Sequence, residues 1–126
     1  MDKVEFEKVL RAKAEAKKVD DSEVPTLLQQ FKPFTAKNGI IRAYYDSNYH
    51  YVVKVKDMEI LRVVKSAIVT RCYFNDTRYQ GGGSLGHYQR MIKNYILRYK
   101  AYIVLTMENI EYGYADRLDA LYRLTH

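Results

Sequence analysis

Three consecutive glycines, Gly81, Gly82 and Gly83, lie between an apolar run and an amphipathic segment rich in basic residues. Glycine lets the backbone approach a ligand closely because it carries no Cβ atom. A helix that begins directly after such a loop points unpaired N–H groups and the positive end of its dipole toward the loop. The arrangement therefore predicts a site for a phosphate group, although a glycine cluster can also serve only as a flexible connection.

Positive charge is concentrated in the section from residue 60 to residue 100. The chain has a formal net charge of +6, and Asp76 is the only acidic residue in this section. The basic residues of the section are Arg62, Lys65, Arg71, Arg78, Arg90, Lys93, Arg98 and Lys100. Such a section attracts anions, which include coenzyme phosphates, nucleic acid and acidic protein surfaces.

A second hypothesis comes from the 13 tyrosines of a chain that has no tryptophan. Tyrosine stacks well on nucleic-acid bases, although half-buried strand positions explain many tyrosines equally well. The chain would then be a small basic, non-catalytic protein that binds nucleic acid or a host protein, as accessory proteins of phages and mobile elements do. Tyr73, Tyr79 or Tyr88 would stack on bases, while the nucleic-acid contacts would come from Arg62, Arg71, Arg90, Lys93 and Arg98. A basic helix face can also be simply solvated.

Other catalytic arrangements are weaker. His50 and His87, together with Arg71 and Arg78, could form a metal-independent ribonuclease site, but nothing in the sequence fixes a partner for either histidine, so the non-catalytic interpretation is favoured. The single cysteine, Cys72, sits among apolar residues and is expected in the core. No Cys/His cluster has zinc spacing, and we expect no metal site.

The residue pattern predicts two N-terminal helices. Residues 2–18 are rich in Ala, Lys, Glu and Leu, which favour a helix with a thin apolar stripe. Pro25 fits the first turn of a short second helix that runs through Phe31. Ile, Val, Tyr and Thr then dominate, and they predict antiparallel strands at about 40–45, 49–56 and 59–74. The last of these strands is expected to break near Lys65.

A helix is predicted after the glycine cluster, because Tyr88, Met91, Ile92, Tyr95 and Ile96 repeat at helical spacing. A short strand at 101–106 and a final helix from Tyr114 to the C-terminus are expected to follow. We therefore predict one domain over 1–126, of the α+β class with α/β-like features, with a mostly antiparallel sheet flanked by helices. Residues 1–36 would be its helical part, and 37–126 would hold the sheet, the glycine loop and the later helices.

This order of elements resembles the GNAT superfamily of acyl-CoA-dependent N-acetyltransferases. The family signature, Gln/Arg-x-x-Gly-x-Gly/Ala between a strand and a helix, is met by residues 78–83, which read RYQGGG. A Leu-Tyr pair in a later helix of the family is matched by Leu121 and Tyr122. The resemblance covers roughly residues 67–126.

The resemblance implies a GNAT-like fold that binds acetyl-CoA and, if it is an enzyme, transfers an acetyl group to an amine. It implies that Tyr122 is the general acid that protonates the departing thiolate. It also implies that the coenzyme pyrophosphate is held by Arg78, Gln80, Gly81, Gly82, Gly83 and Ser84.

The surroundings of the protein are predicted from hydropathy. No apolar run approaches the length of a bilayer span, and the charged N-terminal stretch 2–18 lacks the apolar core of a signal peptide. We therefore expect a soluble protein without a membrane partner, located in the cytoplasm, or in the host cytoplasm if a phage encodes it.

Overall fold

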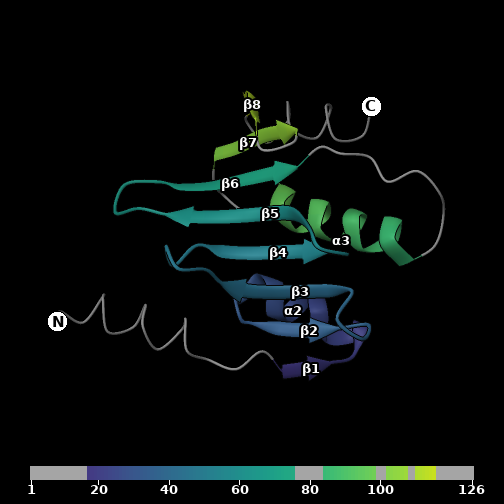
Figure 1. The fold of residues 1–126 in the computed structure, drawn as a ribbon. Helices are drawn as coiled ribbons and strands as arrows, with labels where there is room; N and C mark the ends of the chain where they lie inside the picture. The colour runs from purple at the N-terminus through teal and green to yellow at the C-terminus, as the bar shows by residue number, and fades with distance from the viewer. Residues whose placement is uncertain (1–16, 76–83, 99–101, 108–109, 116–126) are drawn as a thin grey trace, which may run out of the picture.

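The computed structural model describes residues 17–75, 84–98, 102–107 and 110–115. They form one eight-stranded sheet whose strands lie side by side in chain order (Figure 1). The strands are β1 (Lys17–Val19), β2 (Phe34–Ala36), β3 (Ile41–Tyr45), β4 (Tyr51–Val55), β5 (Met58–Lys65), β6 (Thr70–Asn75), β7 (Tyr102–Met107) and β8 (Ile110–Ala115). The helices are α2 (Val24–Gln29) and α3 (Ser84–Arg98), with a 3-10 turn, η1 (Asp21–Glu23), before α2.

The sheet is mixed. Strands β1 and β2 pair in parallel, as do β6 and β7, whereas the pairs from β2 to β6 and the pair β7–β8 are antiparallel. A parallel pair needs a crossover connection, and α3 forms part of the crossover from β6 to β7. The turn between β4 and β5 is tight, since Lys56 and Asp57 both adopt positive φ angles of 50° and 63°.

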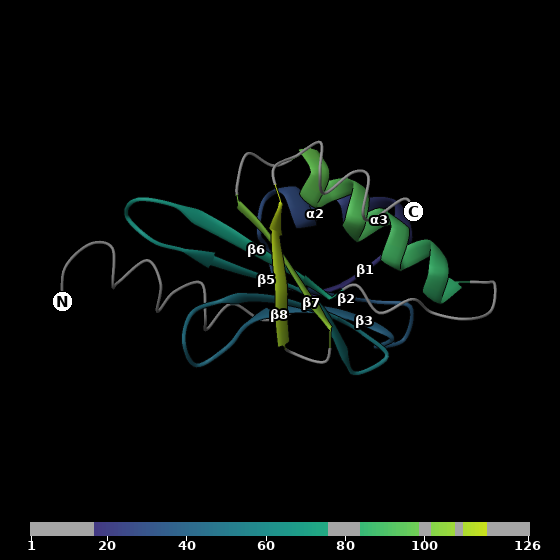
Figure 2. The same cartoon turned by 90° about the horizontal axis from the view of Figure 1, so that it is seen from above.

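Both helices cover the same face of the sheet (Figure 2). Val24 and Leu28 of α2 are fully buried there, as are Tyr88, Ile92 and Ile96 of α3. Each large apolar side chain removed from water in this way stabilises the fold by about 1.5 to 3 kcal/mol. The helices are therefore held mainly by the apolar faces that their sequences predict.

Strand alternation separates a covered face from an outer face, by which we mean the face opposite α2 and α3. In β6, Cys72 and Phe74 are 0% and 1% exposed and belong to the core under the helices. Arg71 is exposed and Tyr73 is half-buried, and both point the other way because side chains alternate along a strand. Burial also raises the pKa of the Cys72 thiol to about 12, which keeps this core residue neutral.

The predicted fold class is wrong. The described residues form mainly an eight-stranded mixed sheet with two short helices on one face, not the helix-flanked, GNAT-like arrangement with two N-terminal helices. Lys17 and Lys18, the last residues of the predicted first helix, instead belong to β1, which pairs with Phe34–Ala36. Tertiary pairing outweighs helix propensity at such positions because the propensity differences are only a few tenths of a kcal/mol per residue.

The predicted C-terminal helix is also wrong where it can be compared. Tyr114 and Ala115 belong to β8, which pairs with β7. Strand β8 pairs with β7 through a register shift between Leu105 and Thr106, so no regular period-two pattern marks this strand in the sequence. The rest of that predicted helix, like residues 2–16 of the first one, lies outside the described residues.

Several individual elements are confirmed. Residues 40–45 and 49–56 correspond to β3 and β4, and 59–74 divides into β5 and β6 after Lys65. The short helix with Pro25 in its first turn is α2, and the helix after the glycine cluster is α3. These are the segments whose periodicity was strongest.

Candidate functional site

A row of side chains crosses the outer face at the middle of the sheet. Pairing between adjacent strands places Tyr44, Val52, Arg62, Tyr73 and Val104 next to one another, from β3 to β7. Neighbouring strands lie about 4.8 Å apart, so adjacent members of the row contact each other. Aromatic and basic groups therefore meet on a face that none of the described helices covers.

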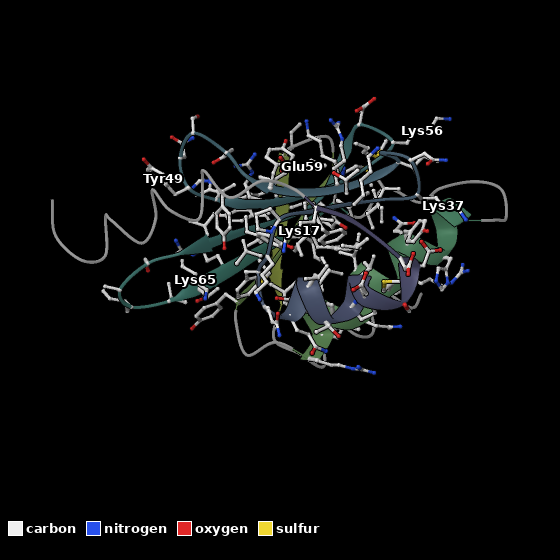
Figure 3. The ribbon with its side chains drawn as sticks, turned by 90° about the horizontal axis from the view of Figure 1, so that it is seen from below. Lys17, Lys37, Tyr49, Lys56, Glu59 and Lys65 are labelled. Atoms are coloured by element: carbon white, nitrogen blue, oxygen red, sulfur yellow. The ribbon has the colours of Figure 1, made fainter. Side chains whose placement is uncertain are left out.

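Arg62 is the centre of an ion-pair cluster, which we name the Arg62 cluster and which also contains Asp46, Glu59 and His50. The guanidinium donates two hydrogen bonds to the Glu59 carboxylate, at 2.6 and 3.1 Å. It also donates to Oδ2 of Asp46 and, at 2.9 Å, to Nδ1 of His50. The arginine side chain is 27% exposed, and Glu59 lies on the outer face in Figure 3. These acceptors use most of its donors, so Arg62 is a structural residue rather than an open anion contact.

Asp46 joins this cluster to the connection between β3 and β4. Its Oδ1 atom accepts hydrogen bonds from the backbone N–H groups of Asn48 and His50, at 2.9 and 3.0 Å. Burial alone would raise the pKa of Asp46, but the hydrogen bonds from Arg62, His50 and Asn48 favour the charged form, and the pKa lies below its ordinary value. The Glu59 and Asp46 carboxylates together raise the pKa of Arg62.

Five further outer-face residues make up what we name the aromatic–basic face: Tyr44, Lys54, Arg71, Tyr73 and Tyr102. Arg71 of β6 lies opposite Tyr102 of β7, whose side chain is 59% exposed. Tyr73 is two residues from Arg71 on the same face, and the ammonium of Lys54 lies 5.8 Å from the centre of the Tyr44 ring. Exposed rings beside cations can stack on planar groups and contact anions at the same time.

Helix α3 carries basic groups, but its two tyrosines are not exposed. Arg90 and Arg98 of α3 are exposed and Lys93 is half-buried. Tyr88 and Tyr95 of the same helix are only 0% and 7% exposed. The predicted stacking role of Tyr88 is therefore wrong, since its ring belongs to the core. The predicted nucleic-acid residues are thus divided between two faces, with Arg62 and Arg71 on one and those of α3 on the other.

Most of the residues to which the GNAT resemblance assigns a role lie outside the described residues: Arg78, Gln80, Gly81, Gly82 and Gly83 for coenzyme binding, and Tyr122 for catalysis. Tyr79, a candidate for base stacking, also lies outside them. Ser84 is the first residue of α3, as expected for the end of the glycine loop.

The two histidines of the ribonuclease alternative are not brought together. His50 contacts Arg62 on the outer face, whereas His87 is exposed on α3, with its ring 5.6 Å from that of Tyr88. Within the described part of the chain, no group of three or more His, Cys, Asp or Glu side chains could hold a metal ion.

Comparison of the chain with known protein families, curated proteins and solved structures finds no match. Neither described helix is long and apolar enough to cross a bilayer.

Sequence reasoning missed Tyr44, Lys54 and Tyr102 as members of the candidate site. A usable signal existed for two of them, because Tyr44 and Lys54 alternate with the core residues Ala43, Val53 and Val55. For Tyr102 the deciding fact is that β7 pairs with β6 rather than with a strand next to it in the chain, which local sequence does not encode.

Proposed function

We propose that the protein binds single-stranded nucleic acid through the aromatic–basic face. The observation that carries this proposal is the pairing of exposed Tyr102 with Arg71, with Tyr73 beside them. Rings on a sheet face offer surfaces on which unpaired bases stack, and the adjacent cations contact the phosphates. Duplexes stack their bases internally, so a stacking surface of this kind favours single strands.

The outer face supports this function better than the outward side of α3. Both surfaces carry exposed arginines, but Tyr88 and Tyr95 of α3 point into the core, so neither tyrosine of this helix is open for stacking. Arg62 takes no part in phosphate contact because Asp46 and Glu59 already neutralise it. The basic groups assigned to the nucleic acid are therefore Lys54 and Arg71.

The test is fluorescence anisotropy with a labelled single strand of about 12 nucleotides and with a duplex of the same sequence, at several salt concentrations. We expect tighter binding of the single strand. Tyr102→Ala should weaken it about tenfold, the loss of one stacked base. Arg71→Gln should reduce the slope of log K against log salt by about 0.7, the loss of one phosphate contact on a single strand.

Arg90→Gln is the matched control, because Arg90 is an exposed arginine of α3 on the opposite side of the molecule. We expect it to leave the affinity nearly unchanged. An equal loss from Arg90→Gln and Arg71→Gln would argue for diffuse attraction, and binding that is insensitive to salt would exclude the proposal.

Acetyl-CoA binding is a second candidate, and one observation favours it. Strands β6 and β7 are parallel and α3 begins within their crossover, so the start of α3 follows the carboxyl end of β6. Phosphate groups commonly bind at such helix starts. A saturable rise in melting temperature with acetyl-CoA, abolished by Gly82→Asp but not by Arg71→Gln, would support this function over the first.

A further inference from the structure

We infer that a pocket at one end of the sheet binds a small planar aromatic ligand that carries one carboxylate or phosphate group. The pocket lies where the end of α2 meets the β3–β4 and β5–β6 connections, and its volume is about 500 Å³. Tyr49 and Lys65, which line it, lie at this end of the sheet in Figure 3. None of its lining residues belongs to the aromatic–basic face, so this inference does not rest on nucleic-acid binding.

Aromatic side chains with fixed positions form the walls. The rings of Phe31 and Tyr51 meet edge to face at 5.5 Å, and those of Tyr45 and Tyr51 lie 5.4 Å apart. The Tyr45 hydroxyl donates to the carbonyl oxygen of Phe31 at 2.8 Å, and the Tyr51 hydroxyl donates to that of Lys32 at 2.9 Å. These bonds fasten both rings to the segment after α2, so the walls are formed before a ligand arrives.

The cation of the pocket is Lys65. Among the described residues that form the pocket, none is Asp or Glu. The Lys65 ammonium lies 4.4 Å from the centre of the Phe31 ring, which places a cation directly on an aromatic wall. Asp46, whose Oδ2 atom lies 4.0 Å from Nδ1 of His50, is bonded to Arg62. The pocket therefore attracts a ring with an anionic substituent, whereas Lys65 repels a ring with a cationic substituent.

Backbone strain occurs at two of the wall residues. Phe31 and Tyr49 have φ angles of 51° and 59°, a region in which bulky side chains are outliers. Phe31 follows the end of α2, where Phe31 N–H bonds to Leu28 and Lys32 N–H bonds to Leu27 in the pattern that normally takes glycine. Strained residues of this kind cluster at ligand sites, where a particular side chain is held in an unfavourable conformation.

Calorimetric titration of the full chain with phenyl phosphate and benzoate tests the inference. Benzylamine is the cationic control, and inorganic phosphate and acetate are the controls without a ring. We expect at least one aromatic anion to bind saturably and about tenfold more tightly than benzylamine or the ringless anions. The tighter of the two aromatic anions identifies the acidic group. Equal or tighter binding of benzylamine, or no binding of either aromatic anion at about 5 mM, would overturn the inference.

Lys65→Met removes the positive charge and keeps most of the side-chain length. It should lower the affinity for the aromatic anion about tenfold. Lys54→Met, the same change on the outer face, should leave this affinity unchanged. Tyr49→Asn provides a second variant, because Tyr49 is 41% exposed and asparagine tolerates its positive φ. This variant should remain folded and bind the aromatic anion about threefold more weakly. An unchanged affinity in both Lys65→Met and Tyr49→Asn would place the ligand elsewhere and refute the site.

Discussion

Arg62 and Arg71 lie on neighbouring strands of the same sheet face, yet their surroundings differ. Arg62 is 27% exposed and donates hydrogen bonds to Asp46, Glu59 and His50. Arg71 is exposed and lies opposite Tyr102, the most exposed tyrosine among the described residues. The Arg62 cluster fastens the β3–β4 connection to β5, whereas the aromatic–basic face leaves its cation in contact with solvent. Positive charge alone therefore does not identify a binding surface.

The largest expected effect is the loss of Arg62. Arg62→Met should lower the free energy of unfolding by about 2 kcal/mol, because Asp46 and Glu59 would keep their partly buried charges without the partner they share. Arg71→Met should change it by less than about 0.5 kcal/mol, as is usual for an exposed residue. Chemical denaturation of both variants measures the difference. Similar losses from both would mean that Arg71 also has a structural role.

The second expected effect is a pH dependence that comes from Asp46. Its pKa lies below the ordinary value of 3.8, so the ionised form is favoured more in the folded chain than in the unfolded one. The stabilisation is therefore complete above pH 3.8 and is lost as the pH falls through the lower, folded-state pKa. We expect wild type to be more stable than Asp46→Asn at neutral pH, and this difference should shrink on acidification. A difference independent of pH would show that only the geometry of the turn matters.

The contrast between the two arginines also explains what the sequence could and could not predict. Arg62 belongs to the basic section from residue 60 to 100, but its acidic partners lie outside it, Glu59 directly before the section and Asp46 in the β3–β4 connection. Counting charges along the chain cannot detect partners supplied by a neighbouring strand or by a turn. The same limit applies to Tyr102, which meets Arg71 through a crossover.

Periodicity predicted the elements best where one face is fully buried. The spacing of Tyr88, Ile92 and Ile96 identified α3 because that helix packs its apolar side on the sheet. The first predicted helix is wrong at Lys17 and Lys18, and the last is wrong at Tyr114, because pairing with another strand decides the conformation there. The left-handed backbone at Phe31 could not be predicted from the sequence. Glycine is the usual residue at such a helix end, and phenylalanine gives no local signal for a positive φ angle.

A smaller loss is expected from Glu59→Gln. The variant keeps a hydrogen-bond acceptor beside Arg62 and leaves Asp46 in place, so the free energy of unfolding should fall by about 1 kcal/mol rather than 2. Denaturation of Glu59→Gln, Asp46→Asn and the double variant gives their interaction energy. Because both carboxylates bond to one guanidinium, the two losses should not be additive, and additivity would contradict a shared cluster.

The smallest effect is expected at Lys54, which separates stability from binding on the outer face. Its ammonium lies 5.8 Å from the Tyr44 ring centre, near the limit of a cation–π contact, so Lys54→Met should cost about 0.5 kcal/mol or less. A double-mutant cycle with Tyr44→Leu measures that coupling directly. If Lys54→Met instead destabilises the fold as much as Glu59→Gln, Lys54 belongs with the structural cations. A small coupling energy together with weaker single-strand binding would place Lys54 with Arg71 as a binding residue. A lysine that is held only by a weak contact with one ring can still reach a phosphate.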